Sequence, residues 1–470
     1  MNLRQHLLRG GAFLAVRHAI GLLLGVGGVL LLTRIIGPAA YGTYTAALGI
    51  SMYVFNLVQS GLNTYLIRSE TQIEARQSDQ AFTLLLLLSL FGSLAAAGST
   101  MFLRHWMRIP GLGPVLLVLA GSMVIQAVAL VPLAQLERAL DFRAVAVCEL
   151  SGTAAYYVAA IPLAICHFGV WAPVTGWWMQ QLVMLSMLVK RTRYRPRLQW
   201  DRVLIREMGG YGLGYCSSTW IWQLRNLVNP LIVGHFVGAE GVAYVGVAVK
   251  VAEVLSFVKS VTWRMSIAVL GHVQRSPERL RKAISEGMQV QALVVGPVLL
   301  TFALLAPRLI PAAFGPRWLP VAAVFPFVAA GYLSNALFQL HCSALYVLKR
   351  NWDVAMFHTC HIVLFAGSSL LLVPRLGIIG YGLAEVAALP AYLVVHIYLA
   401  RRGLRPDYQL PVVWWAAMAV PLFWEQIGIW SLAAVPLALL WPGSLARLKG
   451  YLLAIRSAQA SSGQEYVASA

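Results

Sequence analysis

The chain has 470 residues, of which 59% are hydrophobic and only 11% charged, and its formal net charge is +19. A soluble domain carries about 25% charged residues, so this composition excludes an ordinary soluble protein. Apolar runs of about 20 residues, the length that crosses the hydrocarbon as a helix, recur along the whole chain. The sequence therefore predicts an all-α polytopic membrane protein.

The hydrophobic pattern predicts about fourteen membrane helices. The N-terminal run has the basic flank of a signal sequence, but it continues to Leu32 without a cleavage site and is interpreted as a retained helix. The predicted spans are 11–33, 43–66, 80–103, 113–134, 146–167, 170–189, 209–234, 242–263, 286–306, 321–347, 354–373, 379–400, 411–425 and 428–442.

The two halves of the chain are similar. The segment around Gly37 recurs around Gly238, and Gly42 falls on Ala243 at the same spacing of 201. Each half has six predicted helices, an even number, which predicts parallel repeats related by a pseudo-two-fold axis along the membrane normal. The expected domains are an N-terminal six-helix lobe (1–189), a basic cytoplasmic linker (190–208), a C-terminal six-helix lobe (209–402), two additional helices (403–443) and a cytoplasmic tail (444–470).

The distribution of Lys and Arg predicts the topology. With the N-terminus in the cytoplasm, 26 of the 36 cations fall on cytoplasmic segments, six on the opposite side and four inside helices. Because cytoplasmic loops of membrane proteins are rich in Lys and Arg, both termini are expected in the cytoplasm. The stretch Lys190–Arg206 holds seven cations, which are expected to lie against anionic lipid headgroups and not against a nucleic acid.

The sequence lacks the motifs of a catalytic site. It has no P-loop, HExxH, DxD or nucleophile elbow, and its five cysteines form no CxxC pair. His358 and His361 lie three residues apart, but without acids or thiolate pairs nearby. The chain is therefore not expected to be an enzyme, and no metal or cofactor is expected.

Charged residues inside the predicted helices are the candidate functional residues, because a charge at bilayer depth is costly and usually faces a water-filled path. Arg225 lies near the middle of helix 209–234, where Pro230 predicts a break. It either lines a cavity or is held by a structural ion pair or carbonyl contact.

Lys250 and Glu253 share one face of helix 242–263, as a polar stripe in a cavity or as an internal salt bridge. Lys259 points to the other side, near the cytoplasmic end, where it can snorkel.

Arg17 lies about one and a half turns inside the first helix, lining a cavity or snorkelling. Glu149 opens helix 146–167, and Glu385 and Glu425 lie in later helices. Such acids can carry protons, although near a helix end they are more often solvated. Because the cavity candidates are mainly cationic, they favour an anionic ligand such as a phosphate or pyrophosphate.

Three segments carry a resemblance to a known family: LLTRIIGPAAYGTYTAALGI, LERALDFRAVA and LGIIGYGLAE. They resemble the polysaccharide-transport branch of the multidrug/oligosaccharidyl-lipid/polysaccharide exporter superfamily, the Wzx-like flippases. The resemblance implies two six-helix lobes that form a V and open alternately to each side. It also implies a substrate of undecaprenyl pyrophosphate carrying an oligosaccharide, moved from the cytoplasmic to the periplasmic leaflet of the bacterial inner membrane.

Relatives in that family use cations on helices 1, 2, 7 and 8, and Arg17, Arg225 and Lys250 lie in comparable helices here. Helix 43–66 departs from the pattern because it carries no charge. The resulting hypothesis is that Arg225 and Lys250 hold the pyrophosphate, with Arg17 near the cytoplasmic mouth. Glu253 and Glu149 are the candidates for ion coupling, and polysaccharide polymerase and chain-length or export proteins are the candidate partners.

Two alternatives stay open. A drug or metabolite antiporter of the same superfamily is disfavoured by the scarcity of buried acids. A membrane polysaccharide polymerase or ligase is disfavoured by the short extracytoplasmic loops and the duplicated pattern.

Overall fold

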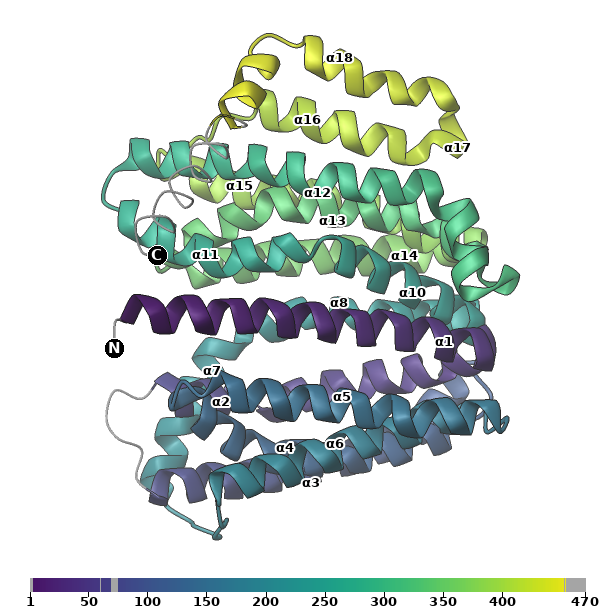
Figure 1. Ribbon diagram of the computed structural model, residues 1–470, viewed down its shortest axis with the longest axis vertical. Coiled ribbons are helices and arrows are strands. Elements are labelled where there is room, and N and C mark those ends of the chain that lie inside the picture. The colour runs from purple at the N-terminus through teal and green to yellow at the C-terminus, as the bar shows by residue number, and fades with distance from the viewer. Residues whose placement is uncertain (1–2, 60, 69–74, 452, 454–470) are drawn as a thin grey trace, which may run out of the picture. The chain divides into compact units, whose positions relative to one another are not determined.

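A computed structural model of the protein describes residues 3–59, 61–68, 75–451 and 453, without the side chains at 3–24, 26, 64, 68, 211–218, 264 and 268. Every secondary-structure element in these ranges is a helix, which confirms the all-α polytopic class (Figure 1). In this part of the chain seven helices are long and apolar enough to cross a membrane, or up to nine if each of two bent pairs is one span. The count of fourteen stays a prediction.

The elements of the first half are α1 (Leu3–Gln59), α2 (Leu62–Arg68), α3 (Ala75–Trp106), α4 (Leu112–Arg138), α5 (Phe142–Ile165) and α6 (Trp171–Thr192). The middle of the chain forms α7 (Arg202–Gln223), α8 (Arg225–Val228), the π-helical turn η1 (Asn229–Val233), α9 (Gly234–Phe236), α10 (Ala239–Leu255) and α11 (Phe257–Val273). Next come α12 (Pro277–Phe314), η2 (Pro316–Trp318), α13 (Pro320–Val347), α14 (Asn351–Ala387), η3 (Leu389–Ala391) and α15 (Tyr392–Ala400). The last elements are α16 (Gln409–Ala419), η4 (Val420–Phe423), α17 (Trp424–Ile427), η5 (Ile429–Ala433) and α18 (Ala434–Leu440).

Two of the long helices are interrupted at a glycine. A straight helix of 57 residues, the length of α1, would measure about 85 Å, far more than the hydrocarbon thickness. Gly37 breaks α1 with φ 77° and ψ 173°, and Gly377 breaks α14 with φ 58° and ψ −135°. Each break takes a single residue, because glycine readily adopts a positive φ. The sequence pattern therefore predicts connections that are too long between helices 11–33 and 43–66 and between helices 354–373 and 379–400.

The contacts divide the chain into two compact units. Unit 1 comprises Met1–Lys250, Pro307–Phe325 and Ala355–Ala388, and unit 2 comprises Val251–Ala306, Pro326–Val354 and Leu389–Ala470. This division is not the one predicted from the repeat, so the two six-helix lobes stay a prediction.

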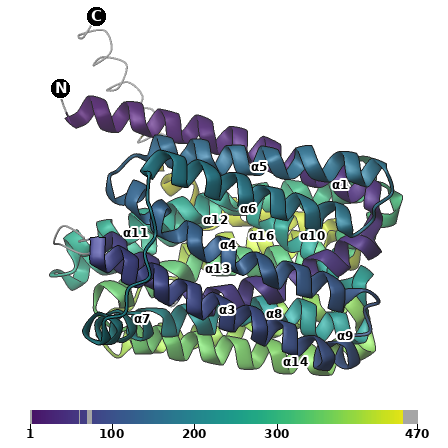
Figure 2. The ribbon, with the colours of Figure 1, turned by 90° about the horizontal axis from the view of Figure 1, so that it is seen from below.

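Within unit 1, antiparallel neighbours in sequence pack against each other. α3 packs on α4 and α5 on α6, and α1 lies against α4 and α5 (Figure 2). Leu85, Met123 and Val131 are fully buried in a core that joins α2, α3 and α4. These side chains are hidden from both water and lipid. Their close packing therefore fixes how the three helices are oriented against one another.

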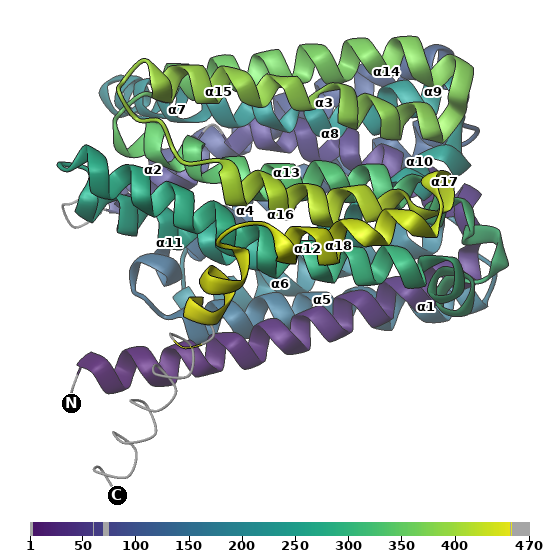
Figure 3. The same ribbon diagram turned by 90° about the horizontal axis from the view of Figure 1, so that it is seen from above.

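Within unit 2, indole N–H groups join helices to their neighbours. Trp414 and Trp415 of α16 donate to Ser444 Oγ at 2.9 Å and to Ser334 Oγ at 3.0 Å. α18 lies beside α16 (Figure 3). The two weak spans predicted at 411–425 and 428–442 therefore form a helical pair within unit 2.

The basic linker is docked on α3. From Arg193 to Asp201 it has no regular secondary structure, and alternate backbone N–H groups donate to side chains of α3. These hydrogen bonds are Arg197 to Asp79 Oδ1 at 3.3 Å, Gln199 to Thr83 Oγ1 at 2.9 Å and Asp201 to Gln80 Oε1 at 2.6 Å. Asp201 also pairs with Arg76 at 2.6 Å and caps α7 by accepting from Val203 N at 2.8 Å. The linker is thus attached to the first half of the chain along its length.

Asp79 of α3 accepts two hydrogen bonds from the linker. Its replacement by alanine is therefore expected to release the linker. Its Oδ1 accepts from Tyr194 Oη at 2.8 Å as well as from Arg197 N. Burial, together with this hydrogen bond to Asp79, raises the pKa of Tyr194. A hydrogen bond to a charged group contributes about 1.5–3 kcal/mol, so trypsin cleavage within 191–197 should accelerate by about tenfold or more. Glu278→Ala, at an exposed acid at the start of α12, is the control, and equal cleavage rates would contradict the role of Asp79.

The two repeated glycine turns meet inside unit 1. Gly37 and Gly238 both have positive φ, 77° and 86°, as their predicted equivalence requires. A Cβ built on Gly42 would lie 1.8 Å from the backbone oxygen of Ala239, so α1 and α10 approach backbone to backbone there. Trp318, only 1% exposed, closes the same end. The predicted topology makes this the extracytoplasmic end of unit 1.

Aromatic rings surround Trp318 at that end. The ring centroids of Tyr41 and Tyr244 lie 5.9 and 6.0 Å from its indole. On the same side, His235 of α9 stacks on Trp106 of α3 with centroids 4.3 Å apart. Edge-to-face and stacked rings each add about 0.5–1.5 kcal/mol beyond their buried area. Segments of the two predicted repeats are therefore joined by ring contacts at this end of unit 1.

Candidate functional site

The predicted break in the helix that carries Arg225 is confirmed. α7 ends at Gln223, and the chain continues through α8 and the π-helical turn η1, in which Pro230 lies at the start. Proline has no N–H to donate, so the regular helical hydrogen bonds cannot continue through it. Beside Pro230, the side chain of Asn229 links this irregular segment to α10, since its Nδ2 donates to Val242 O at 3.1 Å. The break places Arg225 one turn before an irregular segment inside unit 1.

Arg225 is paired with Glu385 of α14, also in unit 1. Its Nη2 donates to Glu385 Oε1 and Oε2, at 2.5 Å each. The Arg225 side chain is 16% exposed and that of Glu385 is 1% exposed. A pair this deeply buried is neutral as a whole, which allows both charges to lie within membrane helices.

Aromatic and imidazole rings enclose the pair. The guanidinium carbon of Arg225 lies 5.5 Å from the ring centroids of both Trp222 and Phe365, within cation–π distance. His358 and His361 of α14 contact the same indole, with ring centroids 4.8 and 5.7 Å from it. The guanidinium is thus held in orientation by two rings and one carboxylate.

This arrangement can bind an anion by exchange. A guanidinium presents its N–H donors in a planar fork that matches carboxylate and phosphate oxygens equally well. Because Glu385 already occupies Nη2, a phosphate must either take the remaining N–H groups or displace the carboxylate. The site therefore contains a cation, Arg225, and an acid, Glu385, that competes with an anionic ligand for it.

The remaining predicted site residues do not all fall in this cluster. Lys250 and Glu253 are exposed on α10, three residues apart and hence on one face. Glu149 is half-buried in α5. Arg17 belongs to α1, but its side chain lies outside the described part of the structure.

Two functional candidates escaped the sequence interpretation, Glu385 as the partner of Arg225 and His361 beside it. Sequence patterns mark Glu385 only as an acid in a late helix. The signal that could have found it is charge balance, since a buried arginine needs a counter-ion and Glu385 is the one acid in span 379–400.

Lys259 was interpreted as snorkelling, but it has a built polar environment within unit 2. Its Nζ donates to Asn335 Oδ1 at 3.0 Å and lies 4.4 Å from the ring centroid of Tyr332. Asn335 Nδ2 donates in turn to Tyr392 Oη at 3.2 Å. These contacts hold the side chain against α13, and its snorkelling near the cytoplasmic end stays a prediction.

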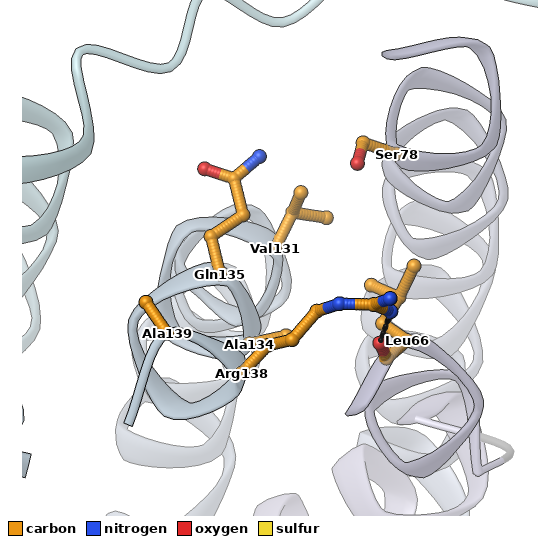
Figure 4. A pocket seen from close by; sticks show the side chains of 7 residues that line it. All are labelled: Leu66, Ser78, Val131, Ala134, Gln135, Arg138 and Ala139. Carbon is orange, nitrogen blue, oxygen red and sulfur yellow. Dashed lines mark hydrogen bonds between the residues drawn. The ribbon is translucent and has the colours of Figure 1, made fainter. Parts of the chain in front are cut away.

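A cavity of about 380 Å³ lies in unit 1 among α2, α3 and α4. Figure 4 shows its lining, in which Arg138 reaches from the last turn of α4 and donates to Leu66 O at 3.2 Å. The last carbonyls of a helix lack partners within it, and a cation there interacts favourably with the helix dipole. Arg138 thus stabilises the end of α2.

In the described part of the chain no three His, Cys, Asp or Glu side chains are placed to hold a metal ion. The four cysteines with described side chains, Cys148, Cys166, Cys342 and Cys360, are all free thiols.

Solved structures share the fold. The chain resembles the lipid II flippase MurJ in an inward closed conformation, with TM-score 0.69 and 11% identity over 91% of this chain and 96% of MurJ. It also resembles an inward-facing multidrug resistance MATE family transporter of the MOP superfamily, with TM-score 0.65 and 15% identity over 83% and 97% of the two chains. At such low identity these likenesses establish a common fold.

Sequence comparisons establish the family. The chain is 24% identical over 306 residues to the succinoglycan biosynthesis transport protein ExoT of Rhizobium meliloti, covering 62% of this chain and 59% of ExoT. It is 22% identical over 222 residues to the teichuronic acid biosynthesis protein TuaB of Bacillus subtilis, covering 47% and 45%. It thus spans less than two thirds of the length of either relative. The polysaccharide biosynthesis protein family matches residues 31–323, well over half of the sequence, and the chain belongs to that family.

Proposed function

We propose that this chain is a flippase that moves undecaprenyl-pyrophosphate-linked oligosaccharide repeat units from the cytoplasmic to the periplasmic leaflet by alternating access. Its family and the transport role in the name of ExoT support the proposal. The fold that it shares with a lipid II flippase agrees with a lipid-linked substrate. The chain acts as a transporter and carries out no covalent chemistry.

The observation that carries the proposal is the buried guanidinium of Arg225 in a member of this family. A cation deep in membrane helices, held in orientation by rings, suits a pyrophosphate that must leave the water. Lys250, exposed on α10, and Arg17 near the cytoplasmic mouth are further headgroup ligands. Glu253 and Glu149 are further candidates for ion coupling.

The protein is multi-pass in the bacterial inner membrane, with both termini in the cytoplasm. The 26 to 6 distribution of cations supports this orientation. The linker arginines that α3 does not engage lie against anionic lipids. A polysaccharide polymerase and chain-length or export proteins receive the translocated units.

Deletion of the gene is expected to trap lipid-linked repeat units on the cytoplasmic leaflet. Leaflet-resolved labelling of these intermediates measures the effect, and surface polysaccharide should fall strongly because the proposed route across the bilayer is lost. For loss of the Arg225 contact alone, a fall of at least about tenfold is expected, since one specific charged contact is worth about 1.5–3 kcal/mol. Arg225→Ala at matched expression should reproduce the deletion. Arg308→Ala, at an exposed cation of α12, is the control and should export normally.

Other outcomes of the same experiment distinguish the alternatives. Units stranded on the periplasmic leaflet would identify a polymerase or ligase. Normal polysaccharide together with altered drug resistance would identify an antiporter. Full export by Arg225→Ala would overturn the role of this arginine in binding the headgroup.

A further inference from the structure

A second, smaller cavity lies within unit 2, where α11, α13 and α15 end and α12 begins. Its volume is about 190 Å³. Two arginines from separate turns line it, together with Gln274 and three leucines: Arg350, Arg402, Leu280, Leu348 and Leu404. The cavity thus combines two guanidinium groups with an apolar lining.

Arg350 is held beside the cavity by an acid in the first turn of α14. Its Nε donates to Asp353 Oδ2 at 2.9 Å, and its Nη2 donates to Oδ1 at 3.5 Å. Among the described residues, Nη1 has no hydrogen-bond partner. A guanidinium presents its donors in a planar fork, so a carboxylate on one edge orients the donors that remain. Arg350 can therefore bind a second acceptor without losing its ion pair.

The turn that carries Arg402 is fixed in place. Leu404, 4% exposed, donates its N–H to Leu399 O at 3.2 Å, and further along the chain Tyr408 Oη lies 2.6 Å from His341 Nε2 of α13. The Arg402 side chain is exposed and forms no hydrogen bond or ion pair within the described part of the chain. The turn thus presents a guanidinium group that is available to a ligand.

The charge around the cavity is positive. Residues 349–353 hold two cations and one acid, and residues 401–407 hold three cations and one acid. α12 begins here at Pro277, and the unsatisfied N–H groups at the start of a helix favour an anion. The acid of its first turn, Glu278, accepts from Ser276 Oγ at 3.3 Å. An anion in the cavity therefore experiences net positive charge from three segments.

The cavity lies at the depth of the lipid headgroups. α13 ends at Val347 and α15 at Ala400, and the predicted topology places both ends at the cytoplasmic face. Trp352, in the first turn of α14, is 79% exposed, and indole rings gather at the membrane–water interface. Anionic phospholipids are abundant in the cytoplasmic leaflet, so their phosphates lie within reach of this cavity.

We propose that the cavity binds the phosphate of an anionic phospholipid of the cytoplasmic leaflet, with Arg350 Nη1 and the guanidinium of Arg402 as donors. Arginine binds phosphate oxygens through strong, charge-assisted hydrogen bonds. At about 190 Å³ the cavity is smaller than the roughly 300 Å³ at which pockets for drug-sized ligands begin, so it fits one headgroup phosphate and not a nucleotide. Binding at this site does not depend on the proposed transport function.

The test is the binding of short-chain phosphatidylglycerol to the purified full chain in a non-ionic detergent. A ligand that binds only the folded protein raises its unfolding temperature with concentration, which gives the Kd. Arg350→Gln combined with Arg402→Gln should raise this Kd about tenfold or more, because each lost hydrogen bond to a charged group weakens binding by about tenfold. Native mass spectrometry of the proteins purified from membranes should show one phosphatidylglycerol fewer on this variant than on wild type.

Lys349→Gln combined with Arg401→Gln is the matched control. Both side chains are exposed, each neighbours an arginine of the cavity in sequence, and neither lines the cavity. The control therefore removes the same charge and should bind phosphatidylglycerol like wild type. Arg402→Gln alone replaces an exposed side chain and should weaken binding in the same direction, which provides a second variant if the double replacement does not fold.

Three results would overturn the proposal. Equal losses in the cavity variant and the control would show that general surface charge attracts the lipid. Equal affinity of wild type for phosphatidylcholine would show that the site does not select an anionic headgroup. Inorganic phosphate that binds as tightly as phosphatidylglycerol would identify a soluble anion, and not a lipid, as the occupant.

Discussion

Replacement of Glu385 by leucine alone is expected to destabilise the protein by about 3–5 kcal/mol, because it leaves the guanidinium of Arg225 buried without its counter-ion. Arg225→Leu should cost about as much, since it strands the carboxylate. The exposures of 16% and 1% place this pair among buried ion pairs and not among surface pairs of small effect. Unfolding of the purified protein in detergent by heat or denaturant measures the loss.

The double replacement by leucine at both positions should recover most of that stability. A buried ion pair replaced by apolar side chains of similar volume is often neutral or stabilising, because neither charge has to be desolvated. A double-mutant cycle then gives a coupling energy of opposite sign to the single effects. Additive losses in the double variant would contradict the pairing.

The same double variant separates stability from transport. It should fold well but export no polysaccharide, since it lacks the cation proposed to bind the headgroup. If the ion pair has only a structural role, export should recover in the double variant together with stability. Surface polysaccharide at matched membrane expression decides between these results.

Gly42→Val is expected to destabilise unit 1 by roughly 3 kcal/mol or more, at the upper end of what overpacking costs. A Cβ at this position would lie 1.8 Å from Ala239 O and 2.5 Å from its carbonyl carbon, so backbone must move and not a side chain. α1 and α10 would separate at the end that Trp318 closes. Thermal unfolding should occur at lower temperature, and polysaccharide export should fall with it.

Gly49→Ala is the matched control on the same helix. Its Cβ would lie 3.6 Å from Pro230 Cγ, an ordinary van der Waals distance. This variant should unfold and export like wild type. Wild-type behaviour of Gly42→Val would show that the backbone contact is dispensable.

Several features of the fold could be predicted because they depend on local chemistry. Long apolar runs identify membrane helices regardless of how these pack. Pro230 predicts the break after Arg225 because a missing N–H acts on its own turn. Gly37 and Gly238 could be matched by spacing, and both adopt the positive φ that other residues rarely reach.

Other features could not be predicted, because they join distant parts of the chain. The docking of the linker on α3 depends on Asp79, a residue 118 positions from Arg197, whose N–H it accepts. The linker's composition alone indicates only a cationic surface. The contact of Lys259 with Asn335 spans 76 positions, and hydropathy near a helix end does not reveal it.

The sequence by itself determined that this is an all-helical membrane protein and that Arg225, set deep in an apolar helix, either lines a cavity or is held by an ion pair or carbonyl contact. Only the tertiary structure decided that the partner is Glu385, 160 residues away, because the fold of unit 1 brings the side chain of this residue of α14 to that of Arg225. The physical reason is that burial makes a counter-ion obligatory, while packing alone selects which acid supplies it. That selection converts an isolated cation into a neutral buried pair.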